Sequence, residues 1–295
     1  MRLYSWMNVC VYAFVWTLPT ASHAKDNLDI RSLLAEDKSW KFDLSYSFLT
    51  SSSKGSEHGD PTILQVGPSS FISIPTFYGE YTDNTNTSVF SLGLRYGLSK
   101  ASEIRLKTNY VWSNYRHVSP TGTDEVSDSR LNSLWIGINH KVKEEDDIPA
   151  LLINAEVAAY ESILATDQHG KSFSFGMAMY KTSDPLVFSL SFTHQIGLRS
   201  KTDQGKYRPG NLSTGTATVY FSANETSTLS TSARLSYKGA SSLNGIKKNE
   251  SHTSIDLIFG IGISMNKKTT TFISTRINAT DKKEAEINLT LSRNI

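Results

Sequence analysis

The chain has 295 residues, 38% of them hydrophobic and 20% charged, and its 30 basic and 28 acidic residues give a net charge of +2. Beyond residue 20 no stretch approaches the roughly 18 to 20 consecutive apolar residues of a membrane-spanning helix, which excludes a helical membrane bundle. The near-neutral charge gives no case for a nucleic-acid partner, and 13 tyrosines and 13 phenylalanines are too many for a disordered polar chain.

The N-terminus has the three parts of a secretory signal peptide. Arg2 supplies a positive charge, residues 9–18 form an apolar core, and small residues precede a cleavage point after Ala24. We therefore expect residues 1–24 to be a cleaved signal peptide. The alternative is a buried N-terminal helix, which Pro19 at the end of the apolar run disfavours. Cys10 is the only cysteine and leaves with the signal, so the exported protein forms no disulfide.

Residues 25–39 are the only convincing helical stretch, because Leu28, Ile30, Leu33 and Leu34 fall roughly on one face of a helix. Two interpretations stay open. The stretch is either a short periplasmic helix that leads into the domain formed by residues 40–295, or a small plug for that domain.

From Trp40 onward, apolar and polar residues alternate with a period of two, which predicts strands with one apolar and one polar face. In residues 40–48 every even position is aromatic or aliphatic and every odd position is polar. Twelve segments share this pattern, at residues 40–48, 90–96, 104–112, 134–138, 151–157, 173–179, 188–196, 217–221, 229–237, 255–263, 273–277 and 287–291.

The connections between these strands alternate in length. Short ones lie at 98–102, 144–149, 182–185, 224–226 and 266–268, and mostly longer, polar ones lie at 51–87, 117–130, 166–171, 201–211, 240–252 and 281–284. Short turns at one end and long loops at the other are typical of an up-and-down transmembrane β-barrel with both termini in the periplasm. We therefore predict an all-β fold, a barrel of about twelve antiparallel strands.

A soluble β-sandwich is the alternative fold, since its strands also alternate. Two features favour the barrel. Aromatic residues stand near strand ends in the apolar rows, as in an interfacial girdle, and the polar rows are rich in glycine and serine. The aromatic residues in question are Trp40, Tyr96, Tyr110, Trp112 and Tyr237.

Residues 92–106 resemble the strand, turn and strand of the outer-membrane family named for the meta-pathway of phenol degradation, a group of presumed transporters. Residues 45–53, which follow a short leucine-rich stretch, are similar to the opening of the same barrels. The resemblance implies a barrel of about twelve strands that acts as a channel. Related barrels export functional-amyloid subunits, but they carry a long coiled-coil extension where this chain has residues 25–39. The chain ends in Ile295, whereas such barrels usually end in an aromatic residue.

The sequence offers no catalytic or metal-binding pattern. The seven histidines are scattered, no pair has the spacing of metal ligands, and no cysteine remains to join them. No nucleophile-elbow motif surrounds a serine, and Ser191 and His194 lie on opposite faces of one strand. We expect no cofactor and no enzymatic activity; an outer-membrane hydrolase is the less favoured alternative.

The polar rows place charged side chains inside the predicted barrel. The inward bases are Lys41, Arg95, Arg105, Lys107, Lys141, Arg234, Lys238 and Arg276, and the inward acids are Asp43, Glu156, Asp256 and Glu286. Asp43 and the bases other than Lys41 are the candidate pore-lining residues. Arg95 and Arg105 flank the first turn, so we expect them to face each other across the hairpin, with Asp43 as the partner of Arg95. Two interpretations stay open: salt bridges that brace the wall, or a filter for anions.

These observations predict an outer-membrane channel or transporter of a Gram-negative bacterium, reached after export through the periplasm. Its cargo would be small solutes, among them anionic or aromatic ones, or an exported polypeptide. The expected partners are outer-membrane lipid, the solute or polypeptide, and the barrel-insertion machinery, and the sequence is compatible with an oligomer. The alternative function is an adhesin or structural barrel that uses the long loop at residues 51–87.

Overall fold

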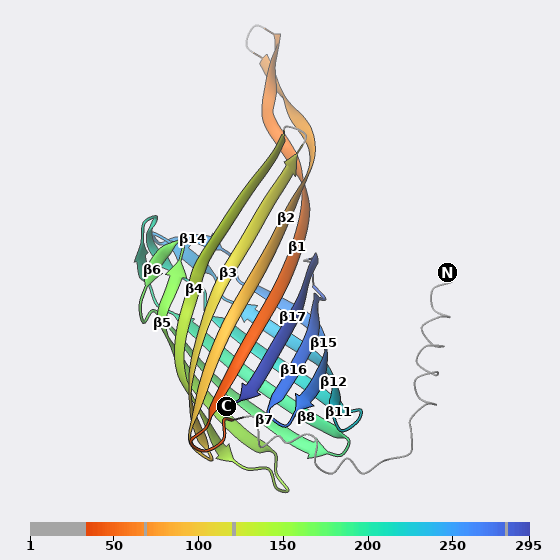
Figure 1. The fold of residues 1–295 in the computed structure, drawn as a ribbon. Coiled ribbons are helices and arrows are strands. Elements are labelled where there is room, and N and C mark those ends of the chain that lie inside the picture. Colours follow the sequence, from red (N-terminus) through yellow and green to blue (C-terminus); the bar gives the residue numbers. More distant parts are fainter. Residues whose placement is uncertain (1–33, 68–69, 120–121, 281–282) are drawn as a thin grey trace, which may run out of the picture.

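The computed structural model describes residues 34–67, 70–119, 122–280 and 283–295, except for the side chains of residues 54–81 and Lys283. The signal peptide expected at residues 1–24 lies outside the described residues. In the described part, twelve antiparallel strands form a closed barrel (Figure 1).

The barrel strands follow one another around the ring in chain order. They are β1 (Trp40–Gly67), β2 (Ser70–Ser99), β3 (Ser102–Ser119), β4 (Gly122–Lys143), β5 (Ala150–Ile163), β7 (Ser172–Ser183), β8 (Leu186–Gly197), β11 (Leu212–Ser222), β12 (Ser227–Lys238), β15 (His252–Asn266), β16 (Thr269–Asn278) and β17 (Lys283–Asn294). Pairing of β1 with β17 closes the ring, and the amide of Ile295 donates to the carbonyl of Trp40 at 2.9 Å. The predicted up-and-down barrel is confirmed.

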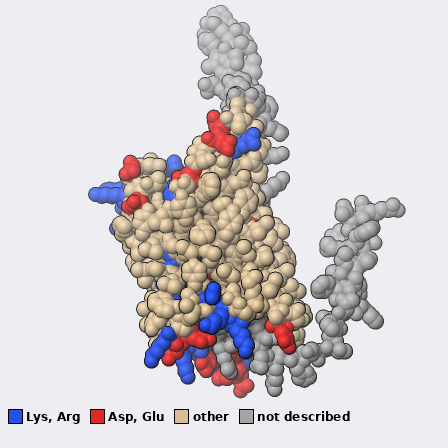
Figure 2. Space-filling model, viewed as in Figure 1, with Lys and Arg blue, Asp and Glu red and all other residues tan. Residues whose placement is uncertain are grey.

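The barrel wall is apolar outside and polar inside. Alternate apolar side chains stay exposed all around the ring, for example Ile136 (44%), Leu190 (53%) and Leu257 (43%). Figure 2 shows the middle of the barrel almost free of charged side chains, which gather toward its two ends. A sandwich would bury this apolar face between two sheets, so the exposure of these side chains excludes it. No helix in the described part of the chain is long and apolar enough to cross a membrane.

The five short turns lie where the sequence predicts them, but two of the long connections are not loops. Residues 51–87 and 117–130 mostly continue the ladders of β1 with β2 and of β3 with β4, up to the pairs Gly67↔Ser70 and Ser119↔Gly122. These hairpins project beyond the barrel (Figure 1). Backbone hydrogen bonds between the two strands hold each hairpin together even where no side chains contact an apolar surface. The alternation of apolar and polar residues therefore stops where the strands leave the barrel wall.

One cluster in this projecting part joins β2 to β3. His117 Nδ1 lies 2.6 Å from Asp83 Oδ1, and the Tyr115 hydroxyl donates to the same oxygen at 2.8 Å. These two bonds hold the pKa of the Asp83 carboxyl below its usual range.

Two other long connections fold into a second sheet at the same end of the barrel. The connection after β8 contains β9 (Ser200–Thr202) and β10 (Gly205–Arg208), and the connection after β12 contains β13 (Ser241–Leu243) and β14 (Ile246–Asn249). These strands pair in the order β14-β13-β10-β9. A short strand, β6 (Thr166–Gln168), pairs with the end of β5. The sequence predicts these connections only as polar loops.

The described part of the predicted helix at residues 25–39 is not helical. Residues 34–39 instead lie along the end of β2: the amide of Lys38 donates to the carbonyl of Gly97 at 2.9 Å, and the amide of Gly97 donates to the carbonyl of Ser39 at 3.0 Å. Because these backbone groups bond to β2, they are not available for a helical turn. Leu34 and Ala35 are buried. Residues 25–33 lie outside the described residues.

Candidate functional site: the lumen of the barrel

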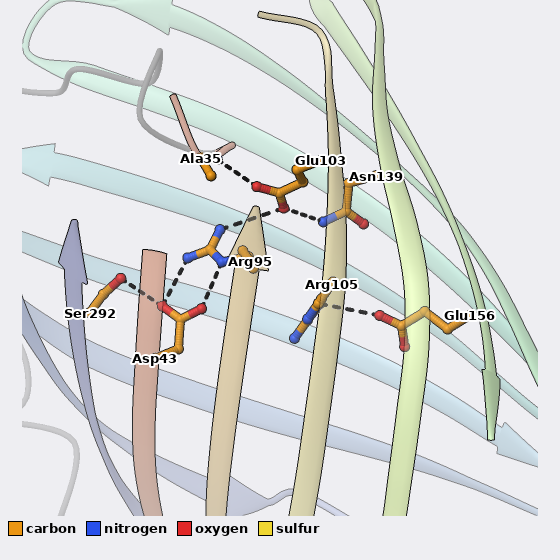
Figure 3. A network of polar contacts seen from close by, with 8 residues as sticks. All are labelled: Ala35, Asp43, Arg95, Glu103, Arg105, Asn139, Glu156 and Ser292. Atoms are coloured by element: carbon orange, nitrogen blue, oxygen red, sulfur yellow. Dashed lines mark hydrogen bonds and ion pairs between the residues drawn. The ribbon is translucent and has the colours of Figure 1, made fainter. Parts of the chain in front are cut away.

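The polar face of β1, β2 and β3 carries an ion-pair network at the end of the lumen where the short turns lie (Figure 3). Arg95 binds Asp43 with two parallel hydrogen bonds, from Nε to Oδ2 at 2.7 Å and from Nη2 to Oδ1 at 2.8 Å. The Ser292 hydroxyl of β17 donates to Asp43 Oδ1 at 2.6 Å. This bidentate geometry fixes the guanidinium plane and links three neighbouring strands.

Glu103 extends the same network toward the N-terminal segment. Its side chain is fully buried, and Oε1 lies 3.8 Å from Arg95 Nη1 and accepts a hydrogen bond from Asn139 Nδ2 at 2.6 Å. Oε2 accepts the backbone amide of Ala35 at 2.5 Å. One carboxylate therefore satisfies a cation, a side-chain amide and a backbone amide, and it joins residues 34–39 to the wall.

Sequence reasoning missed Glu103 because it placed the start of the strand at Ile104. Alternation could have identified it, because Glu103 is an odd-numbered residue and therefore lies on the same face of the strand as Arg105 and Lys107.

Arg105 lies directly opposite Arg95 in the ladder, as the sequence predicts. Its own partner is Glu156 of β5, with Nη1 3.4 Å from Oε1. Gly137 stands between the two in register, opposite Arg105 on one side and Glu156 on the other. A Cβ at Gly137 would lie 2.5 Å from Glu156 Cγ, so the glycine leaves the space through which Glu156 reaches over β4.

A second ion-pair network lies on β15, β16 and β17. Arg276 Nε lies 2.7 Å from Glu286 Oε2, and its Nη1 lies 3.3 Å from Asp256 Oδ1. Asp256 is almost fully buried and also accepts a bond from Asn278 Nδ2 at 2.9 Å. The four predicted inward acids and three of the predicted inward bases, Arg95, Arg105 and Arg276, therefore lie in two separate networks.

The remaining candidate bases have different surroundings. Lys141 pairs with Glu144 of the following turn at 2.7 Å, and Lys238 is exposed at the end of β12. Lys107 is half-buried, and no ion pair to it occurs within the described residues. Arg234 lies across from Asp256 in register, yet its buried Nε has no hydrogen-bond partner in the described part of the chain. Lys107 and Arg234 thus offer positive charge that the two networks do not neutralise.

No group of three or more His, Cys, Asp or Glu side chains that could hold a metal occurs among the described residues. His194 faces away from the lumen, where its Nδ1 lies 2.8 Å from the Ser213 hydroxyl, and the described residues add no carboxylate to this pair. A serine–histidine contact without a group that orients the histidine lacks one part of a catalytic triad.

Comparisons with known proteins identify the fold. No family model matches the chain, and no curated protein matches it. An outer membrane channel from Pseudomonas putida F1 shares 11% identity with a TM-score of 0.58, over 88% of this chain and 96% of that chain. The transport unit of the autotransporter AIDA-I from Escherichia coli shares 8% identity with a TM-score of 0.51, over 97% and 96%.

A deletion mutant of TodX, named a monoaromatic hydrocarbon channel, shares 11% identity with a TM-score of 0.50, over 92% of this chain and 93% of that chain. At these identities the likeness shows the fold alone, which is that of outer-membrane β-barrels. The resemblance to the phenol-degradation family and to amyloid exporters stays a prediction.

Proposed function

We propose that the protein is a passive channel of the bacterial outer membrane that passes small polar solutes and prefers anions. The observation that carries the proposal is the inside-out barrel, with an exposed apolar band outside and charged and hydroxyl side chains inside. Exposure of so large a continuous apolar surface to water is unfavourable, whereas the hydrocarbon core of a bilayer would cover it.

The polar lumen supports a polar cargo. TodX is named a monoaromatic hydrocarbon channel, and such a solute would need an apolar path. In this chain the wall carries Asp43, Arg95, Arg105 and Glu156 at the periplasmic end, where desolvation by an apolar solute would be unfavourable. Residues 34–39 also occupy the lumen side of β2 at that end, which disfavours passage of a polypeptide in this conformation.

Lys107 and Arg234 support a preference for anions. The other inward bases named in the two networks have carboxylate partners, so they act mainly as cross-links of the wall. A lysine that has no such partner contributes its full charge to the potential in the lumen, and charge on the wall sets pore selectivity.

The test is single-channel recording of the refolded protein in planar bilayers. We expect the wild type to prefer anions and Lys107→Glu to shift the reversal potential toward cations. Lys100→Glu is the matched control, because Lys100 lies in the turn between β2 and β3 outside the lumen and should leave the preference unchanged. Arg105→Glu is a poorer test, since it would place a second carboxylate against Glu156.

Two results would overturn the proposal. The first is a wild-type channel without anion preference, or an ion preference that Lys107→Glu does not change. Either finding would show that the lumen charges serve only as structural ion pairs. No permeation of ions, sugars or organic acids at all, in bilayers and in liposome swelling, would exclude a channel. It would favour the adhesin alternative, for which the projecting hairpins of β1 to β4 offer a surface.

A further inference from the structure

The second sheet, formed by β9, β10, β13 and β14, holds a recess at the end of the barrel opposite the short turns. The recess has a volume of about 630 Å³ and is lined by Arg199, Lys201, Thr202, Gly205, Lys206, Asn244 and Gly245. Three of these seven residues are cations, and all three are exposed. Among the described residues, no ion pair connects Arg199, Lys201 or Lys206 to an acid.

The charge of the recess belongs to both connections that build the sheet. Residues 198–211 and 239–251 contain six bases, Arg199, Lys201, Lys206, Arg208, Lys247 and Lys248, and two acids, Asp203 and Glu250. Six minus two gives +4, whereas the net charge of the whole chain is +2. Glu250 lies 3.1 Å from Lys247 on β14, so it does not neutralise the recess. Positive potential therefore concentrates on this part of the extracellular surface.

The two hairpins hold the cations in a fixed relative position. Pairing of Tyr207 with Leu243 joins β10 to β13. At the turns, the backbone amide of Lys206 donates to Asn244 Oδ1 at 2.8 Å, and the backbone amide of Asn244 donates to the carbonyl of Lys206 at 2.7 Å. Asn244 adopts a positive φ of 54° and Gly245 one of 85°, and a Cβ at Gly245 would meet nothing within 4 Å. The space next to Gly245 is therefore empty, and the recess is open to solvent beside this turn.

We propose that this recess binds the phosphate or carboxylate group of an extracellular ligand. Several like charges brought together without acidic partners are favourable only when an anion lies among them. Arginine and lysine donors on a fixed framework, next to the Thr202 hydroxyl, provide both the charge and the hydrogen bonds that such a group accepts.

Two sources carry this chemistry at the outer surface of a Gram-negative cell. One is the phosphorylated head group of lipopolysaccharide in the outer leaflet, and the other is a free phosphorylated or carboxylated solute. Neither depends on whether the lumen conducts, so the site is independent of the proposed channel function.

Binding to the folded protein in a zwitterionic detergent tests the proposal. Isothermal titration with inorganic pyrophosphate represents the free solute, and capture by vesicles that contain lipid A, against vesicles of phosphatidylcholine alone, represents the lipid head group. The informative variant is Lys201→Gln with Lys206→Gln. The matched control is Lys267→Gln with Lys268→Gln, two exposed lysines in the short turn between β15 and β16 at the opposite end.

We expect the recess variant to lose about tenfold or more in affinity for one of the two probes, and the control to stay within about twofold of the wild type. Raising the salt concentration should weaken binding by the wild type more than by the recess variant, since the variant has fewer charges to screen. Loss for pyrophosphate alone assigns a free solute, and loss for lipid A alone assigns the lipid.

Equal affinity of the wild type and the recess variant for both probes, or no binding of either probe by the wild type, would overturn the proposal. Folding is checked for each variant by its gel mobility before and after heating. If the double variant does not fold, Lys201→Gln alone replaces it, with Lys267→Gln as its control, and the same criteria apply.

Discussion

The facing arginines Arg95 and Arg105 show how a barrel wall tolerates like charges directly opposite each other. Such a pair in a ladder is destabilising by some tenths of a kcal/mol unless carboxylates intervene. Asp43 binds Arg95 and Glu156 binds Arg105, so each cation is neutralised from the side away from the other. Replacement of either acid would leave a partly buried arginine without its strongest partner.

Glu103 should contribute more to stability than any exposed acid of the chain. Glu103→Ala would leave Arg95 Nη1, Asn139 Nδ2 and the amide of Ala35 without their acceptor. We expect the free energy of unfolding to fall by about 3 kcal/mol, measured by denaturant titration in lipid vesicles. Glu144→Gln is the control, because that side chain is 78% exposed and its ion pair should contribute less than about 1 kcal/mol. Similar losses in the two variants would contradict the network.

At this scale the sequence predicts faces better than contacts. Strict alternation correctly places Asp43 beside Arg95 and Arg105 opposite it, because register in a hairpin follows from the turn. The alternation of residues 151–157 does not extend to Glu161, which has the same parity as Leu151 and Val157 but is buried and accepts a bond from Ser172. A bulge in the pairing of β4 with β5 shifts the phase there, and a single sequence carries no signal for a bulge.

Among the elements, residues 34–39 differ most from the sequence-based expectation. The leucines of residues 25–39 follow a helical spacing, yet the described residues 34–39 form a turn, in which the amide of Ser39 donates to the carbonyl of Glu36, and bond to the end of β2. Free backbone groups at the end of a strand offer hydrogen bonds that an isolated helix of this length could not match. The projecting hairpins have the same cause, since backbone pairing extends strands into stretches that have no apolar alternation.

The contact of residues 34–39 with β2 depends on the absence of a side chain at Gly97. A Cβ there would lie 1.9 Å from the carbonyl oxygen of Glu36 and 2.9 Å from that of Ala35. These are backbone atoms, so they can move away only if the whole segment moves. We therefore expect Gly97→Ala to displace the segment while the barrel keeps its ladder. Ala35→Cys supplies a reporter, because Cys10 is the only cysteine and is absent from a chain that starts at Lys25.

Labelling of Cys at position 35 by a membrane-impermeant maleimide measures the displacement. We expect faster labelling when Gly97→Ala is added, and a larger single-channel conductance from the same protein. Gly215→Ala is the matched control, since a Cβ at Gly215 would meet only one atom, at 4.0 Å. Equal labelling rates in the two backgrounds would show that the segment does not depend on the contact at Gly97.

For the whole molecule, the sequence predicts the distribution of polarity but not the architecture at the end of the barrel opposite the short turns. Alternation reflects contact with lipid on one face and a polar interior on the other, so it marks each strand only where the strand crosses the apolar band. The sheet of β9, β10, β13 and β14 joins segments from two distant connections. Its pairing follows from the position of the barrel strands that carry the hairpins, which no local pattern encodes.

The position of the apolar band relative to lipid gives the last prediction. Ile136 and Val126 both belong to β4 and are both exposed, at 44% and 62%, but Ile136 lies in the band whereas Val126 lies in the projecting hairpin. Ile136→Arg should lower the free energy of unfolding in lipid vesicles by about 2 to 4 kcal/mol, because the charge would enter the hydrocarbon core. Val126→Arg should change it by less than about 0.5 kcal/mol, since that position stays in water. Denaturant titration of both variants in vesicles measures the difference, and equal effects would show that the exposed apolar band is not the surface that lipid covers.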